Sequence, residues 1–367
     1  MEKIHLNLYS GYYNHRGYKF AKVLKKLYTR IYLSACDNKK KTQTYRYEEI
    51  NTQNKIKSLS LKNSSYLGWM LNHIIYFRNK NVKTISIHNL KLMPIGIILK
   101  FFFKAKVIYE PHELETETLH KRKLKKFISK IIERICIKFV DYTVVVSPSI
   151  AKWYKRTYNI SMPLVVNNSR FNQNFKKKNI FRKKFKIKKN KTIFLYIGNI
   201  NKEGRGLHKL LEAFSNNENS NNVIIFMGSG GLVKEIKAIS KKNDNIFYHK
   251  PAQTRNLHFY TSSADVGICL IENTCLNENY CLPNKLFEYL SGGIPVVVSN
   301  LFELKNFIEK NRCGYVYNLE NDNLNKFIKQ ISLKRDLDAK SKNAKKTAIK
   351  YDWKNEEKKI INIYNNI

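Results

Sequence analysis

The stretch that decides the fold class is residues 283–298, Pro283-Asn-Lys-Leu-Phe-Glu288-Tyr-Leu-Ser-Gly292-Gly293-Ile-Pro295-Val-Val-Val298. Pro283 fits just ahead of a helix start, Glu288 falls one turn into that helix, and the glycine pair ends it. Pro295 then opens a short apolar run that is typical of a strand buried on both faces. A helix followed at once by such a strand predicts one unit of a parallel α/β sheet.

The same alternation extends outward from this stretch in both directions. Short β-branched or aromatic runs, separated by longer amphipathic stretches, predict strands at residues 82–87, 106–109 and 142–146, then at 192–197, 223–227, 265–270 and 294–298. A basic run without apolar periodicity, residues 175–191, separates the two series. We therefore predict two doubly wound, Rossmann-like α/β domains, in which ligands bind at the carboxyl ends of the strands.

The length and composition of the chain are sufficient for two hydrophobic cores, and its net charge is strongly positive. The chain has 367 residues, and 68 Lys and Arg against 28 Asp and Glu give a net charge of +40. Such a surplus predicts an anionic partner: nucleic acid, an acidic membrane face or a phosphorylated substrate. The charge is spread along the whole chain, and no nucleic-acid reader motif accompanies it.

Cysteine use and apolar runs bear on the compartment. The six cysteines contain no C-x-x-C pair and no histidine at zinc spacing, so neither a metal cage nor a disulfide framework is predicted. The N-terminal residues alternate like a strand and lack the apolar core of a signal peptide. The longest apolar run, residues 92–103, is shorter than the ~20 residues that a membrane span needs. We expect a cytoplasmic protein.

Two glycine-rich loops follow predicted strands and precede helices. The first runs from Gly198 to Gly206 and carries Arg205, so its backbone N–H groups and the guanidinium can form an anion site suited to phosphate. The second is Gly228-Ser-Gly230-Gly231, whose glycines either admit a ligand close to the backbone or serve tight packing. In the opening stretch, Glu288 sits one turn above a helix N-terminus, where a carboxylate can accept both hydroxyl groups of a ribose.

Together, in order and spacing, these motifs and Ala264-Asp265 resemble the donor-binding domain of GT-B glycosyltransferases, in the retaining, glycogen-synthase-like group that makes bacterial surface polysaccharides. The N-terminal half is similar to the acceptor side of that group at His88-Asn89 and at Val107-Ile-Tyr-Glu-Pro-His112-Glu113. The resemblance implies two domains facing a central cleft: an acceptor-binding domain at 1–175, a nucleotide-sugar-binding domain at 176–350, and a helix at 351–367 that crosses back to the first.

The resemblance implies a hexosyltransferase that moves a sugar from a nucleotide diphosphate sugar to a glycan or lipid-linked acceptor, in capsule, lipopolysaccharide or exopolysaccharide biosynthesis. It implies no metal and no cofactor. Its catalytic residues map to His112, which reaches toward the donor sugar, Arg205, which neutralises the leaving diphosphate, and Glu288, which holds the ribose. The substrate-binding residues that it implies are Gly198, Asn199, Gly228, Gly230, Pro283, Asn284 and Lys285.

The chain departs from that family pattern at two positions. The family usually places Arg directly after the first glycine, where this chain has Asn199, so the second cation is missing or comes from Lys202 or Lys285. The first Glu of the family's E-x7-E pattern is replaced by Tyr280, with Glu278 nearby. The donor sugar, the nucleotide base, the acceptor and the stereochemical outcome therefore stay open.

Residues 119–140 predict a basic amphipathic helix with apolar positions at Leu124, Phe127, Ile128, Ile131, Ile132, Ile135 and Phe139. We expect this apolar stripe to pack on the sheet. A helix of this kind also suits the surface of an anionic bilayer, so peripheral contact with the inner face of the cell membrane is the further expectation. Two other functions fit parts of the sequence: a sugar-nucleotide epimerase or isomerase on the same fold, and a basic nucleic-acid-binding protein.

Overall fold

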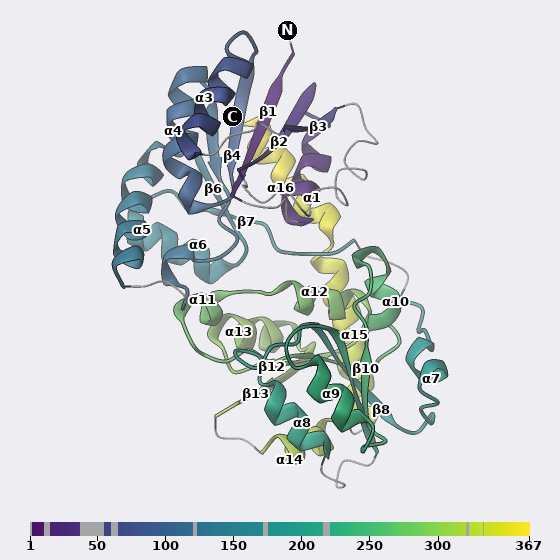
Figure 1. Cartoon of the computed structure of the whole chain (residues 1–367). Coiled ribbons are helices and arrows are strands. Elements are labelled where there is room, and N and C mark those ends of the chain that lie inside the picture. The colour runs from purple at the N-terminus through teal and green to yellow at the C-terminus, as the bar shows by residue number, and fades with distance from the viewer. Residues whose placement is uncertain are drawn as a thin grey trace. The chain divides into compact units, whose positions relative to one another are not determined.

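Two parallel sheets organise the chain in a computed structural model, which describes residues 2–10, 15–36, 55–59, 65–119, 123–171, 175–215, 221–320, 323–332 and 334–367. The chain divides into two compact units (Figure 1). The N-unit comprises Met1–Asn167 with Glu356–Ile367, and the C-unit comprises Asn168–Asn355. The predicted fold class, α/β with two doubly wound Rossmann-like units, is confirmed.

The N-unit has a seven-stranded sheet in the order β3-β2-β1-β4-β5-β6-β7. Its strands are β1 (Ile4–Ser10), β2 (Arg30–Cys36), β3 (Ile56–Leu59), β4 (Val82–Ile87), β5 (Lys106–Tyr109), β6 (Tyr142–Val145) and β7 (Leu164–Val165). Its helices are α1 (His15–Leu24), α3 (Tyr66–Phe77), α4 (Met93–Phe103), α5 (Lys123–Cys136), α6 (Pro148–Tyr158) and most of α16 (Trp353–Asn365), with the short 3₁₀ turns η1 (Leu90–Leu92), η2 (Glu115–Glu117) and η3 (Ile137–Phe139). The strand order reverses between β1 and β4, so a ligand-binding crevice is expected at their carboxyl ends.

The C-unit has a six-stranded parallel sheet in the order β10-β9-β8-β11-β12-β13. Its strands are β8 (Thr192–Asn199), β9 (Asn222–Ser229), β10 (Ile246–His249), β11 (Val266–Cys269), β12 (Val296–Ser299) and β13 (Gly314–Tyr317). Its helices are α7 (Ile180–Lys184), α8 (Leu207–Ser215), α9 (Val233–Ser240), α10 (Leu257–Thr261), α11 (Leu276–Tyr280), α12 (Asn284–Ser291), α13 (Phe302–Asn311), α14 (Leu324–Ile331) and α15 (Lys334–Lys350), with the 3₁₀ turn η5 (Thr254–Asn256). Here the order reverses between β8 and β11.

Both faces of the C-unit sheet are covered by apolar side chains. Along β8, Ile193, Leu195 and Ile197 enter one buried cluster, while Phe194 and Tyr196 enter the other. Alternate residues of a strand point to opposite faces, so a strand with no polar face must lie between two layers of helices. This is why the continuous apolar runs in the sequence predicted these strands correctly.

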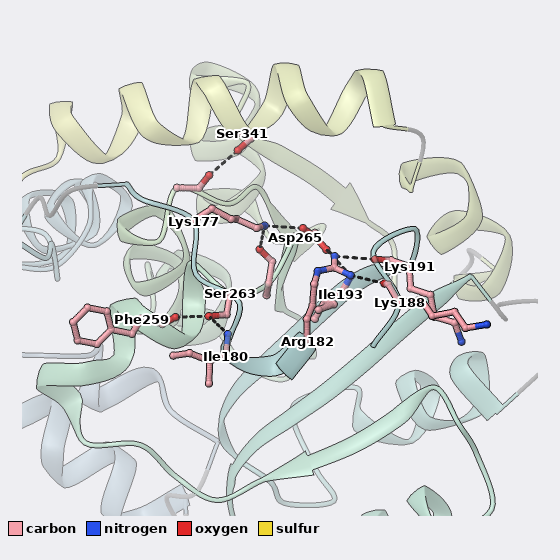
Figure 2. A network of polar contacts seen from close by, with 12 residues as sticks. Lys177, Ile180, Arg182, Lys188, Lys191, Ile193, Phe259, Ser263, Asp265 and Ser341 are labelled. Carbon is pink, nitrogen blue, oxygen red and sulfur yellow. Dashed lines mark hydrogen bonds and ion pairs between the residues drawn. The ribbon is translucent and has the colours of Figure 1, made fainter. Parts of the chain in front are cut away.

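Two aspartates lie at the amino ends of the strands, on the edge opposite to the expected ligand sites. Asp265, just before β11, accepts hydrogen bonds from the Ile193 amide at 2.8 Å, from Arg182 at 2.8 Å and from Lys177 at 2.7 Å (Figure 2). In the N-unit, Asp141 precedes β6 in the same way and accepts from the Val107 amide at 2.8 Å. Each carboxylate therefore joins two neighbouring strands, which is a structural role.

The helix α5 corrects one sequence expectation. Its apolar stripe, defined as Leu124, Phe127, Ile128, Ile131 and Ile135, is exposed rather than packed on the sheet. The buried side chains of the helix are Glu133 and Cys136. The Glu133 carboxylate accepts hydrogen bonds from the hydroxyl groups of Tyr109 at 3.0 Å, Tyr154 at 2.7 Å and Tyr158 at 2.6 Å. These three donors hold the polar side of α5 inward, and the apolar stripe consequently faces outward.

Within the described residues, no helix is long and apolar enough to cross a membrane.

Candidate active site

The glycine loop at residues 198–206 leaves the carboxyl end of β8, at the point where the C-unit strand order reverses. Gly198, Gly204 and Gly206 have φ angles of 126°, 77° and 61°. These are left-handed conformations that favour glycine. The carboxylate of Glu272, three residues after β11, accepts hydrogen bonds from the amides of Gly204 at 3.1 Å and Gly206 at 3.2 Å. These two amides are therefore committed to Glu272, and the loop is held in one shape with Arg205 between its anchor points.

The second glycine loop packs tightly on the first. Gly228 lies opposite Gly198 in the sheet, and a Cβ at Gly228 would overlap the Gly198 carbonyl oxygen. Gly230 has a φ of 151°, and a Cβ there would overlap the Ile200 carbonyl. Of the two roles that the sequence left open for these glycines, close packing of backbone on backbone is thus present. It positions the 198–206 loop.

A second cation lies beside this loop. Lys285, in the first turn of α12, places its ammonium 4.8 Å from the centroid of the Tyr196 ring. Burial lowers the pKa of Lys285, and the nearby Arg205 guanidinium lowers it further. Among the described residues the ammonium has no hydrogen-bond or ion-pair partner. Arg205 Nη1 is 3.9 Å from Glu278 Oε2. Glu278 pairs with Arg205 and leaves Lys285 without an ion pair of its own, so a bound anion would stabilise both cations.

The helix α12 begins at Asn284 as the sequence predicted, and Pro283 caps it without a side-chain hydrogen bond. Gly292 forms its C-cap, and Gly293 follows with a φ of 72°. Glu288, one turn into the helix, is buried and forms an ion pair with the Arg170 guanidinium. Burial lowers the pKa of Arg170 to about 10. Arg170 is a residue that the sequence analysis missed, because it lies more than a hundred positions from its partner.

The N-unit carries a second polar cluster where its strand order reverses. His112 Nε2 is 3.2 Å from His88 Nδ1, and His88 Nε2 is 3.2 Å from Asn7 Oδ1. The Tyr9 ring stacks on His88 with the centroids 4.3 Å apart. Burial, aided by Arg16, lowers the pKa of His112 to about 3, and burial lowers the pKa of His88 as well. Both imidazoles are therefore neutral near pH 7, so contacts between them are hydrogen bonds of neutral rings.

The predicted site residues thus fall into two sets. Those of the second half, from Gly198 to Glu288, gather at the carboxyl ends of β8 and β9 and at the start of α12. Asn199 is exposed, and its carbonyl accepts the Tyr196 hydroxyl at 2.7 Å. His112 lies in the N-unit. Tyr12 and Tyr13 lie outside the described residues, and Arg16 of α1 is buried.

Within the described part of the chain, no group of three His, Cys, Asp or Glu side chains is placed to hold a metal ion. The expectation of transfer without a metal stays a prediction.

The family model for glycosyl transferases group 1 matches residues 177–350, which lie wholly within the C-unit. This part of the chain is a glycosyltransferase domain, and the protein is an enzyme of the transferase class. A search of curated protein sequences found no match.

Solved structures of similar fold cover the whole chain. HepE of Anabaena, solved with UDP-glucose, is 13% identical, with a TM-score of 0.76 and full coverage of both chains. A glycosyltransferase of Rickettsia africae is 15% identical, with a TM-score of 0.76 over 100% of this chain and 98% of that one. The lipopolysaccharide outer core galactosyltransferase WaaB is 14% identical, with a TM-score of 0.69 and full coverage of both. At these identities the likeness shows the fold, which is GT-B.

Proposed function

We propose that this enzyme transfers a hexose from a nucleotide diphosphate sugar to a glycan or lipid-linked acceptor during synthesis of a surface polysaccharide: capsule, lipopolysaccharide or exopolysaccharide. The observation that carries the proposal is the pair of cations, Arg205 and Lys285, at the strand ends of a glycosyl transferases group 1 domain. Lys285 has a ring contact but no anionic partner of its own within the described residues. A diphosphate is the anion that such a domain would bring there.

The cations would act on the leaving group. When the bond between sugar and diphosphate breaks, negative charge grows on the diphosphate oxygens, and fixed cations stabilise that charge. In this proposal Arg205 and Lys285 hold the two phosphates, and the uncapped first turn of α12 adds its backbone N–H groups. Lys285 thereby supplies the cation that Asn199 does not. Loss of one such contact typically costs ~3 kcal/mol, on the order of a hundredfold in rate.

Glu288 would accept hydrogen bonds from the two ribose hydroxyl groups of the donor. Its ion pair with Arg170 holds this buried carboxylate in one position. Arg170 therefore acts as a positioning residue. His112, neutral near pH 7, would hydrogen-bond the donor sugar, and His88 would set the orientation of its ring.

Uridine is the first base to test, because HepE was solved with UDP-glucose. The role in surface polysaccharide synthesis is supported by the similar fold of WaaB, which acts on the lipopolysaccharide outer core.

We further propose that transfer requires neither metal nor cofactor. A rate that is unchanged by EDTA is the expected result, and a rate restored by added Mg²⁺ or Mn²⁺ would contradict it.

The test is a thermal-shift panel of UDP-, GDP-, CDP- and dTDP-sugars, since a ligand that binds the folded state raises the apparent Tm. We expect one nucleotide class to raise the Tm of the wild type, and Lys285→Met and Arg205→Gln to abolish the shift. The matched control is Lys202→Met, an exposed lysine of the same loop, which should keep it. A Tm shift that is lost in Lys202→Met and kept in Lys285→Met would contradict the assignment of Lys285 as the second cation that holds the diphosphate.

Glu288 needs a conservative variant, because Glu288→Ala would leave Arg170 buried without its partner. We expect Glu288→Gln to stay folded and to weaken the shift with nucleotide sugars, because its amide has one acceptor oxygen where the carboxylate has two. Product analysis then separates transfer from the isomerase alternative, because an isomerase alters the nucleotide sugar with no acceptor present. A clear shift with oligonucleotides and none with nucleotide sugars would favour the nucleic-acid-binding alternative instead.

We place the enzyme on the cytoplasmic side of the cell membrane, where nucleotide sugars are available to a lipid-linked acceptor, and propose peripheral contact with the inner face.

A further inference from the structure

The outward-facing stripe of α5 continues onto the neighbouring helices α3 and α4. Leu67, Leu71 and Ile75 of α3 and Phe101 and Phe102 of α4 are also exposed. Leu67 is 67% exposed, and Phe101 and Phe127 are each 62% exposed. Large apolar side chains in such number and proximity are unusual on the surface of a protein that works alone in water. We call these five residues, together with the α5 stripe, the apolar face.

Packing within the N-unit brings together the three helices that carry the apolar face. The helix α4 packs against α3 and against α5, and Figure 1 shows α3 and α4 next to each other. The rings of Phe101, at the end of α4, and Phe139, just after α5, have centroids 5.8 Å apart. The three helices therefore present their exposed apolar residues on adjoining surfaces.

Basic side chains border the apolar face. The helix α5 carries five lysines and arginines, and its one acidic residue, Glu133, is buried under three tyrosines. Lys123, Lys125 and Arg134 are exposed beside the stripe, and Lys104 is exposed at the end of α4. Lys126 and Lys130 pair with Glu117 at 2.8 Å and 2.6 Å. The exposed ionised groups of α5 are thus all positive.

We propose that the apolar face docks on an anionic membrane surface, with Phe101, Phe127 and their neighbours inserted among the lipid headgroups and the lysines bound to the lipid phosphates. An apolar stripe between basic flanks is the pattern of a helix that lies in the plane of a bilayer. Charge argues against a second copy of the chain as the occupant, because a symmetric dimer would bring two basic borders together. This docking rests on the peripheral membrane contact proposed above and gives it a surface. It can be measured with no donor present, so its failure would leave the proposed sugar transfer standing.

Insertion is tested by fluorescence. We expect the added tryptophan of Phe127→Trp to shift its emission to the blue with vesicles of phosphatidylcholine and phosphatidylglycerol, and far less with phosphatidylcholine alone. The matched control is Phe302→Trp, an exposed phenylalanine of α13 in the C-unit, which should show no shift. Equal shifts at both positions, or none at Phe127→Trp, would overturn the proposal.

Binding is tested by vesicle flotation at low salt. We expect the wild type to float with anionic vesicles. The double variant Lys123→Glu with Lys125→Glu should bind at least on the order of tenfold more weakly. The same reversal at Lys241 and Lys242, exposed in the C-unit, should have little effect. A triple variant, Leu71→Ser with Phe101→Ser and Phe127→Ser, should lose binding while it keeps the Tm of the wild type. Flotation equal to that of the wild type in either face variant would overturn the proposal, as would a wild-type dimer that the triple variant converts to a monomer.

Discussion

The carboxyl group of Glu110 is fully buried in the N-unit. Its Oε1 accepts hydrogen bonds from Ser86 Oγ at 3.1 Å and Tyr364 at 3.2 Å, and its Oε2 lies 3.7 Å from His88 Nδ1. Burial raises the pKa of Glu110 from 4.5 to about 7, although Arg16 acts in the opposite direction. The folded N-unit therefore favours the protonated form of this group.

The raised pKa of Glu110 makes the stability of the N-unit depend on pH. Because the pKa of Glu110 is raised on folding, its contribution to stability is full below about pH 4.5 and is lost as the pH rises through about 7. Glu110→Gln stays neutral at every pH. We therefore expect the unfolding free energy of the variant, relative to the wild type, to rise by about 2 kcal/mol from about pH 5 to about pH 8.

Urea unfolding at both pH values measures this difference. The histidines of the cluster are present in both proteins, so their titration cancels. Glu212→Gln, an exposed carboxyl on α8, is the control and should show no such dependence on pH. A difference between Glu110→Gln and wild type that is constant with pH would mean that Glu110 is ionised in the folded protein.

At the scale of the element, α5 shows how one polar residue sets the orientation of a helix. The apolar stripe of α5 would favour burial, yet Glu133 and its three tyrosine donors hold the opposite side inward. We expect Glu133→Ala to lower the unfolding free energy by about 3 kcal/mol, because the buried hydroxyl groups of Tyr109 and Tyr154 and the half-buried one of Tyr158 lose their acceptor. Glu133→Gln should cost less, because its amide oxygen still accepts.

Hydrogen exchange of the α5 amides identifies where the loss occurs. In Glu133→Ala, exchange in α5 should accelerate more than in the strands of the N-unit, because the helix loses its anchor. Glu309→Ala, at an exposed position of α13, is the control for helix propensity. Unchanged exchange in α5 would show that its other contacts suffice to hold it.

At the scale of the whole molecule, each unit has its own sheet and its own core. The residues proposed to hold the nucleotide diphosphate, Arg205, Lys285 and Glu288, all belong to the C-unit. We expect UDP to slow hydrogen exchange at residues 198–206 and 284–288, while exchange in the strands of the N-unit stays unchanged. Mass spectrometry of peptides from the intact chain measures both. Protection of the N-unit strands without protection of the 198–206 loop would contradict the position of the site.

The local sequence pattern was enough to predict most of the central strands and the helix α12. Short β-branched or aromatic runs predicted β4, β5, β6, β8, β9, β11 and β12, because strands that are largely buried on both faces are rich in these residues. The strands β2, β3, β7, β10 and β13 escaped prediction; four of them are edge strands, and β2 lies next to the edge strand β3. Start and stop signals placed α12 correctly because capping depends on neighbouring residues alone.

The amino-acid sequence by itself determined the α/β class, the doubly wound arrangement and the glycine loops, since periodicity and turn chemistry are local properties. Only the tertiary structure decided which distant side chains meet: Glu272 with the amides of the first glycine loop, Arg170 with Glu288, and Glu133 with its tyrosines. It also reversed the expected orientation of α5. Helical spacing shows that a helix has an apolar side, but which side turns inward depends on the hydrogen bonds that the rest of the fold offers to the other.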